Sequence, residues 1–227
     1  MTGDPLIVAI DGPSGVGKST TSRLVARKLQ IPHIDTGAMY RAIAIAALRQ
    51  GIGTRDGEAL ADLASRNRIE FLPGERPRVL LNGEDVSNII RTPEVSMAAS
   101  DVSSIPGVRR VLVRLQQELG RQSGGVLEGR DIGTKVFPET PHKFFLTARP
   151  EVRARRRFEE LVKKGESADF DTVLAATIQR DEQDSSREDS PLRSDQTYSV
   201  VDTSDLSIDD VVDTIVRSVR ATANGRR

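Results

Sequence analysis

The sequence predicts an α/β fold in which a mostly parallel β-sheet carries helices on both faces. Strand-like apolar runs alternate with segments of helical periodicity along the chain, and this alternation is typical of such sheets. The first apolar run, Leu6–Ile10, leads into a glycine-rich turn. Beyond the turn, Thr21, Leu24 and Val25 recur at helical spacing. Strand, turn and helix therefore follow one another from the start of the chain.

The middle of the chain departs from this alternation. A helix is expected from Thr36 to about Gln50, because Asp35 or Thr36 can cap its free N–H groups. A short helix at Glu58–Ser65 and two strand-like runs, Arg68–Leu72 and Arg78–Leu81, follow a glycine-rich break. We expect a β-rich insertion at about 59–103, within a core made of residues 1–58 and 104–227.

The second half returns to strands and helices. Pro106 suits the first turn of a helix whose apolar stripe includes Val108 and Leu112. The remaining elements are expected as strands at Val126–Gly129, Lys143–Thr147 and Tyr198–Asp202, and as helices at Glu151–Gly165, Asp169–Gln183 and Leu206–Arg220.

Composition excludes several classes of protein. The chain has 227 residues, with 33 basic and 33 acidic side chains, and this balance argues against a general nucleic-acid binder. The absence of cysteine excludes disulfides, a thiolate zinc site and a cysteine nucleophile. No apolar run approaches the ~20 residues of a membrane span, and the first residues lack a signal-peptide pattern. We expect a cytoplasmic, monomeric enzyme that binds neither membrane nor nucleic acid.

The glycine-rich turn carries the P-loop pattern G-x-x-x-x-G-K-[ST]. Its glycines let backbone N–H groups converge on phosphate oxygens, and the helix that follows directs its positive end at the same anion. Lys18 can reach the β- and γ-phosphates, and the Ser19 hydroxyl can ligate Mg²⁺. A chance turn is the alternative, but the flanking strand and helix argue against it. A nucleoside triphosphate is therefore expected on Gly12, Pro13, Ser14, Gly15, Val16, Gly17, Lys18, Ser19 and Thr20.

Several charged residues leave two interpretations open. Arg41, one turn into its helix, is either a solvated charge or a clamp on a phosphate. Arg153 and Arg157 share a helix face at i, i+4, either as solvated charges or on a mobile lid at about 150–187. Arg180, Asp184 and Arg187 recur at i, i+4 and i+7, which by itself favours an exposed, salt-bridged face.

Arg130 and Asp131 follow the strand-like run Val126–Gly129 directly. Open α/β sheets bind their ligands at the carboxyl ends of the strands. This pair therefore lies where a ligand of the predicted sheet is expected.

Four segments taken together resemble the bacterial type of cytidylate kinase, a family of P-loop nucleoside monophosphate kinases. They read GPSGVGKST, DTGAMYR, EGRDIGT and RDEQDSSR, and the LNGEDVS stretch of the expected insertion adds to the resemblance, which runs from Leu6 to about Arg220. It implies a parallel-sheet core with an acceptor-binding insertion and a helical lid. It also implies transfer of the γ-phosphoryl group of ATP to CMP or dCMP, with Mg²⁺.

The resemblance implies a role for particular residues. The acceptor phosphate would be bound by Arg41, Arg130 and Arg187, the cytosine by Ser100, Arg109 and Asp131, and the pentose by Arg180 and Asp184. Thr36 stands where the family also has serine, and its hydroxyl completes the CMP site. The catalytic set would be Lys18, Arg130, Arg187, Arg153 and Arg157.

Three other functions compete with this expectation. The nearest is a kinase of another small acceptor, such as a different nucleoside monophosphate. A non-catalytic nucleotide switch is disfavoured because the guanine-binding pattern N-K-x-D is absent. A nucleic-acid-dependent ATPase is the third.

Overall fold

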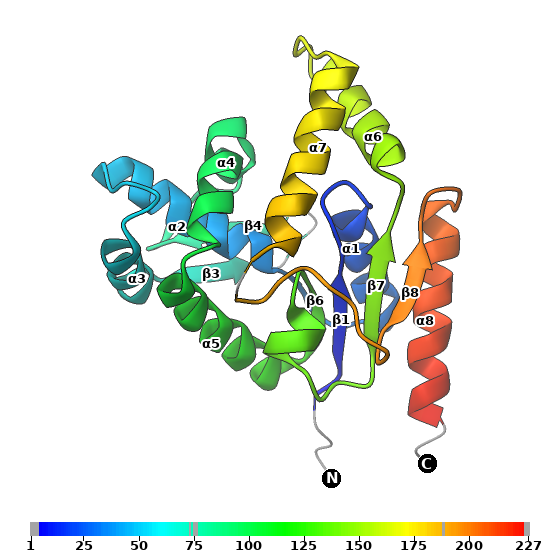
Figure 1. Ribbon diagram of the computed structural model, residues 1–227. Coiled ribbons are helices and arrows are strands. Elements are labelled where there is room, and N and C mark those ends of the chain that lie inside the picture. The colour runs from blue at the N-terminus through cyan, green and yellow to red at the C-terminus, as the bar shows by residue number, and fades with distance from the viewer. Residues whose placement is uncertain (1–4, 73, 75–76, 188, 225–227) are drawn as a thin grey trace. The chain divides into compact units, whose positions relative to one another are not determined.

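In the computed structural model, the first apolar run forms β1 (Ile7–Asp11), the middle strand of a five-stranded sheet (Figure 1). The strand order is β2–β6–β1–β7–β8, with β2 at His33–Asp35. β1 pairs in parallel with both β6 (Gly125–Gly129) and β7 (Lys143–Thr147). β7 pairs in parallel with β8 (Ser199–Asp202). The interior of β1 is fully buried, as a parallel strand covered on both faces should be. The predicted parallel α/β sheet is confirmed.

The structure describes residues 5–72, 74, 77–187 and 189–224. They fall into two compact units: unit 1 comprises the residues up to His33 and from Gly124 onward, and unit 2 comprises Ile34–Ser123. None of the described helices is long and apolar enough to cross a membrane.

The core of unit 1 lies between the sheet and two helices. Apolar side chains of α1 (Lys18–Leu29) and α8 (Ile208–Asn224) pack in one cluster with residues of β1, β6, β7 and β8. Val25 of α1, Ile215 of α8 and Phe144 of β7 are buried members of that cluster. This packing fixes the amino end of α1 close to the carboxyl end of β1.

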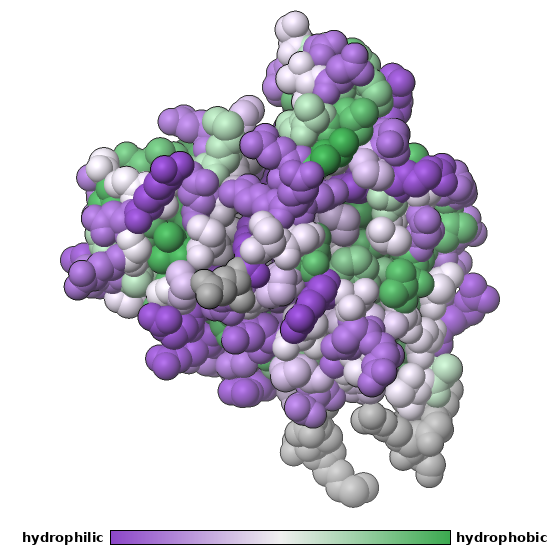
Figure 2. Space-filling view, viewed as in Figure 1, coloured by the Kyte–Doolittle hydropathy of each residue, from purple (hydrophilic) through white to green (hydrophobic). Residues whose placement is uncertain are grey.

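Two helices, α6 (Pro150–Lys163) and α7 (Phe170–Ser185), stand beyond the carboxyl ends of the strands of unit 1 (Figure 1). Phe158 of α6 meets Phe170 of α7 edge to face, with ring centroids 6.2 Å apart. The guanidinium of Arg155 lies over the Phe170 ring. Hydrophobic areas show on this part of the surface in Figure 2, and Val162 of α6 and Ile178 of α7 are exposed.

Unit 2 has its own core, built mainly from helices. The helix α2 is buried along most of its length because its sequence is rich in alanine and isoleucine, and it shares one apolar cluster with the other helices of the unit. The elements are β2 (His33–Asp35), whose first residue belongs to unit 1, α2 (Thr36–Gln50), α3 (Gly57–Arg66), β3 (Ile69–Leu72), β4 (Arg78–Leu81), β5 (Glu84–Asp85), η1 (Ile89–Arg91), α4 (Pro93–Val102) and α5 (Pro106–Ser123). The antiparallel sheet order is β3–β4–β5.

Unit 2 is wider than the insertion expected from sequence. The expected limits, 59 and 103, fall inside it, because α2 before them and α5 after them pack on the same core, for example through Ile43 and Leu112. Apolar periodicity along one helix does not reveal which neighbour buries it. That residues 59–103 form an acceptor-binding insertion stays a prediction.

Candidate active site

The turn between β1 and α1 has the backbone of an anion-binding loop. Gly12, Gly15 and Gly17 all adopt positive φ, at 144°, 80° and 91°. A side chain at position 12 would also overlap the carbonyl oxygen of Leu146 on β7, so only glycine fits there. Gly17 precedes the first residue of α1, Lys18. The N–H groups of the first turn of α1 therefore face the end of the loop, ready for an anion.

Lys18 is buried within this loop, with 8% of its surface exposed. Its Nζ donates to the carbonyl oxygen of Pro13 at 2.6 Å. Burial lowers the pKa of the Lys18 amine, and the positive charge of Arg130 lowers it further, while Glu128 and Asp184 act in the opposite direction. A polyanion in the loop would relieve this concentration of positive charge.

Ser19 lies against a buried carboxylate. Its Oγ donates to Oε2 of Glu128 at 2.9 Å, and Nε2 of His33 lies 3.0 Å from Oε1 of the same carboxylate. Glu128 is the next-to-last residue of β6 and lies opposite Ile10 of β1, close to where the loop begins. A hydroxyl and a carboxylate are hard oxygen ligands, which suit Mg²⁺ when phosphates and water supply the others. Within the described residues, no group of three or more histidine or acidic side chains could hold a metal.

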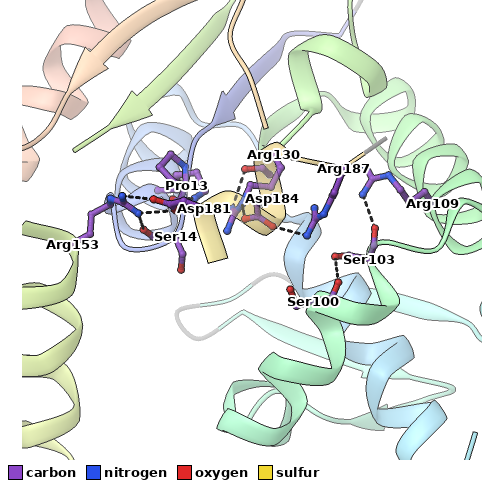
Figure 3. A network of polar contacts seen from close by, with 12 residues as sticks. Pro13, Ser14, Ser100, Ser103, Arg109, Arg130, Arg153, Asp181, Asp184 and Arg187 are labelled. Carbon is purple, nitrogen blue, oxygen red and sulfur yellow. Dashed lines mark hydrogen bonds and ion pairs between the residues drawn. The ribbon is translucent and has the colours of Figure 1, made fainter. Parts of the chain in front are cut away.

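A second cluster of charge is organised by Asp184, near the end of α7. Its Oδ2 accepts from Nε of Arg130 at 2.8 Å, and its Oδ1 accepts from Nη2 of Arg187 at 2.5 Å (Figure 3). The Asp184 side chain is only 2% exposed. Burial alone would raise the pKa of this carboxyl, but Arg130 and Arg187 outweigh burial and hold it below its ordinary value. The two arginines are thus oriented before any ligand arrives.

This cluster differs from the exposed face that the spacing alone favours. α7 ends at Ser185, so Arg187 lies beyond the helix and reaches back to Asp184 across one turn. The spacing of these residues along the chain predicted that they lie close together, but it did not show that Asp184 is buried and that only 9% of the Arg187 side chain is exposed.

Arg153, at the start of α6, is also buried rather than solvated. Its Nε donates to the carbonyl oxygen of Ala148 at 3.0 Å, and Nη1 donates to the carbonyl of Ser14 in the loop and to Oδ1 of Asp181 on α7 (Figure 3). The side chain is 3% exposed. Arg153 therefore connects the loop to both α6 and α7.

Arg157, predicted as its partner on the helix face, has a different environment. Its side chain is 42% exposed and pairs with Glu160 at 2.9 Å within the same helix. This is the arrangement of a solvated charge. That Arg153 and Arg157 cover the transferring group stays a prediction.

Four of the expected acceptor residues belong to unit 2. Asp35 caps α2 by accepting from the N–H of Ala38, and its other oxygen accepts from Nη2 of Arg41 at 2.9 Å. The Nε of Arg41 is buried and lacks a hydrogen-bond partner among the described residues. A buried donor of this kind suits an anionic ligand. Thr36, the second of the four, is buried in the first turn of α2.

The other two of the four lie near the junction of α4 and α5. Arg109 is buried, donates to the carbonyl oxygen of Ser103 at 3.0 Å and lies 5.6 Å from the centre of the Tyr40 ring. The carbonyl oxygen of Ser100 accepts from the Ser103 hydroxyl at 2.8 Å. The remaining five expected acceptor residues, Arg130, Asp131, Arg180, Asp184 and Arg187, belong to unit 1.

Sequence reasoning missed three acidic residues of unit 1. Asp11 is the last residue of β1, Glu128 is the next-to-last residue of β6, and Asp181 pairs with Arg153. A carboxylate near the carboxyl end of a strand in the predicted parallel sheet is a signal that could have found the first two. Nothing local could have found the pairing of Asp181, because its partner lies in another helix.

The fold and the loop define a P-loop phosphotransferase. A family model described as cytidylate kinase matches residues 8–221. A cytidylate kinase of Geobacter sp. (strain M21) is 47% identical over 216 residues, covering 95% of this chain and 93% of the relative. That of Geobacter sulfurreducens is 49% identical with the same coverage. The chain therefore belongs to the cytidylate kinase family.

Solved structures support the fold alone. An uncharacterized protein from Eubacterium ventriosum superposes with a TM-score of 0.54 at 14% identity, covering 95% of this chain and 98% of that one. A gluconokinase from Sinorhizobium meliloti 1021 gives a TM-score of 0.50 at 15% identity, covering 97% and 95%. Both similarities extend over nearly the whole chain, as expected for a shared architecture.

Proposed function

We propose that this enzyme transfers the γ-phosphoryl group of ATP to CMP or dCMP and releases ADP with CDP or dCDP. The observation that carries the proposal is the grouping of Lys18, Arg130 and Arg187 around buried carboxylates at the carboxyl ends of parallel strands. Transfer between two phosphates requires such a concentration of positive charge. Family membership supplies the identity of the base.

On the donor side, loop residues 12–20 bind the triphosphate through backbone N–H groups, and Lys18 contacts the β- and γ-phosphates. The hydroxyl of Ser19, beside the Glu128 carboxylate, would hold Mg²⁺. When bound, the ion neutralises charge on the β- and γ-phosphates. Lys18 leaves the Pro13 carbonyl when the triphosphate offers it a better acceptor.

On the acceptor side, Arg41, Arg130 and Arg187 hold the phosphate by forked hydrogen bonds. Arg180 and Asp184 contact the pentose, and Thr36 completes the site with its hydroxyl. Asp184 has a second task, because it orients two of the three phosphate-binding arginines. That preorganisation lowers the entropy lost when the acceptor binds.

Base recognition falls to Ser100, Arg109 and Asp131. The exocyclic amino group of cytosine is a donor, and the buried Asp131 carboxylate is an acceptor for it. Uracil has an oxygen at that position and would face the carboxylate with a second acceptor. The guanidinium of Arg109 can donate hydrogen bonds to the ring carbonyl oxygen and N3 of cytosine.

The transfer is direct and in line, without a phosphoenzyme. The acceptor phosphate oxygen is already anionic, so no strong general base is needed, and positioning with charge neutralisation performs the catalysis. Arg153 and Arg157 cover the transferring group, and closure of α6 and α7 excludes the water that would otherwise hydrolyse ATP. We also propose that the enzyme acts in the cytoplasm as a monomer; every proposed site residue belongs to this one chain, so a second copy is not needed to complete the site.

A coupled assay for ADP against a panel of nucleoside monophosphates tests this function. We expect multiple turnovers with CMP and dCMP, and at least about 10-fold lower kcat/KM with UMP, AMP and GMP, from the 1–3 kcal/mol of a good base contact. Best activity with another acceptor would favour the nearest rival. ADP formation without any monophosphate, or only with nucleic acid present, would favour the ATPase alternative. Binding of ATP without turnover would indicate a switch.

Asp131→Asn is expected to narrow the preference for CMP over UMP by about 10- to 100-fold, because an amide no longer selects an amino donor over a carbonyl. The measurement is the ratio of kcat/KM for the two acceptors at saturating ATP. Glu139→Gln, an exposed acidic residue in the same segment after β6, serves as the control and should leave the ratio unchanged. A preserved ratio in Asp131→Asn would place base selection elsewhere.

A further inference from the structure

A carboxylate outside the expected site joins two parts of it. Asp11, the last residue of β1, is fully buried. Its Oδ1 accepts from the N–H of Ile132 at 2.9 Å, and its Oδ2 accepts from the N–H of Gly133 at 2.9 Å. The hydroxyl of Tyr198 donates to the same Oδ2 at 2.7 Å. Three donors thus converge on one buried side chain.

Asp11 and its backbone partners are next to two parts of the proposed site in the sequence. Asp11 is followed directly by Gly12, the first residue of the phosphate loop. Ile132 and Gly133 follow directly after Asp131, the residue proposed to recognise the base, and begin the π-helical turn η2 (Ile132–Val136). Asp11 is therefore the residue before the phosphate loop, and its carboxylate holds the backbone N–H of the residue that follows Asp131.

Tyr198 is itself held in place. Its ring meets Phe145 of β7 edge to face, with centroids 6.0 Å apart. A Cβ at Gly133 would lie 2.6 Å from the Tyr198 hydroxyl oxygen, so this close approach requires glycine. Burial, together with the Asp11 charge, raises the pKa of Tyr198 above its ordinary value, which keeps the hydroxyl protonated as a donor.

Stability alone does not account for a charge at this position. Burial raises the pKa of Asp11 to about 6, the N–H groups of Gly133 and Ile132 lower it, and the charge of Asp131 raises it again. A buried carboxylate is often less stabilising than a well-packed apolar side chain of similar volume. We therefore expect the effect of Asp11 to lie in the geometry that it imposes on the backbone of Ile132 and Gly133.

We infer that Asp11, clamped by Tyr198, is a positioning residue that holds Asp131 in register with the phosphate loop for base selection. The inference rests on the proposed role of Asp131. Strand pairing of β1 with β6 and β7 keeps the phosphate loop in place without this contact. Loss of the contact therefore affects recognition of the acceptor and not binding of ATP. CMP discrimination and the KM for CMP respond, whereas the KM for ATP does not.

The test compares Tyr198→Phe with the wild type and with Val201→Ala. Tyr198→Phe removes the hydrogen bond to Asp11, together with the hydroxyl's hydrogen bond to the Thr134 side chain, and keeps the ring. We expect the CMP to UMP ratio of kcat/KM to fall about 3- to 10-fold, the range of one hydrogen bond. The KM for ATP should stay within about 2-fold. Val201→Ala truncates a buried residue of β8 three positions away, so it lowers the Tm and should preserve the ratio.

A double-mutant cycle separates positioning from a general structural effect. If Tyr198 acts through Asp131, Tyr198→Phe has no further effect on the ratio in an Asp131→Asn background. Asp11→Asn, the second variant, should reduce the ratio more than Tyr198→Phe, because an amide places a donor against donors. An unchanged ratio in Tyr198→Phe, or equal losses in both backgrounds, would overturn the inference while leaving the proposed function intact. An unchanged ratio in Asp131→Asn alone would refute the base assignment and this inference with it.

Discussion

Lys18→Ala is expected to reduce kcat by about 10³-fold or more while the fold survives. In phosphoryl transfer, a single positioned cation at the transition state contributes about 10³–10⁵ in rate. Lys18 is the one basic residue in the sequence of loop residues 12–20. Its amine is buried and its pKa is lowered by burial, so removing it takes away a costly desolvated charge and should not lower the Tm appreciably.

The matched control for this variant is Lys28→Ala in the same helix. Lys28 is exposed, pairs with Asp213 of α8 and lies at the opposite end of α1 from the loop. We expect wild-type kcat from it and a stability change within about 1 kcal/mol, the range of an exposed ion pair. Steady-state ADP formation and thermal unfolding measure both quantities. Full activity in Lys18→Ala with a normal melting curve would remove the donor site from the proposal.

Asp184→Ala is expected to lower both stability and acceptor binding. Removing one partner of a buried ion pair leaves the other charge uncompensated and costs about 3–5 kcal/mol, and here two guanidinium groups are left facing each other. Without the shared carboxylate, Arg130 and Arg187 lose their orientation. We expect kcat/KM for CMP to fall by at least about 10²-fold, with the larger part in KM.

The same variant tests the pentose contact. If Asp184 touches the 2′-hydroxyl, the losses with CMP and with dCMP are unequal, because only the ribose offers that group. Equal losses would contradict the contact and leave Asp184 with its role toward the arginines. Glu182→Ala, an exposed acidic residue two positions earlier in α7, is the control and should change neither acceptor.

The pH dependence of stability gives an independent check on Asp184. Its folded-state pKa lies below the ordinary value of 3.8, so its contribution is complete above about pH 4 and is lost as the pH falls through the folded-state pKa. The wild type should therefore lose stability on acidification in this window. In Asp184→Ala that part of the loss is absent, which equilibrium unfolding at a series of pH values measures.

The donor half of the site could be predicted from sequence because it is contiguous. Residues 12–20 form one turn and the start of one helix, and the glycine positions, the lysine and the hydroxyl all follow from local backbone geometry. The parallel sheet was predictable for a similar reason, since apolar strands and periodic helices can be recognised from short segments of sequence. The resemblance to cytidylate kinases, carried by several such segments, is confirmed by the family match.

The environment of the arginines could not be predicted in this way. Arg153 and Arg157 lie one turn apart, and the sequence places them on the same helix face. In the structure, however, the Arg153 side chain is buried and pairs with Asp181, whereas the Arg157 side chain is 42% exposed. The partner of Arg153 lies 28 residues away, on another helix. A single helix face contains no information about which second helix covers it.

The sequence by itself determined the class of protein, the phosphate loop and the order of the strands and helices, because each depends on residues close together in the chain. Only the tertiary structure decided which charges are buried and which carboxylate holds them. Asp11 and Tyr198 are 187 residues apart in the sequence. They meet at hydrogen-bond distance only because strand pairing sets Asp11, Phe145 and Val200 side by side, which brings Tyr198, two residues before Val200, within reach of Asp11. Burial of a charge is a property of the assembled sheet and helices, and no local pattern specifies it.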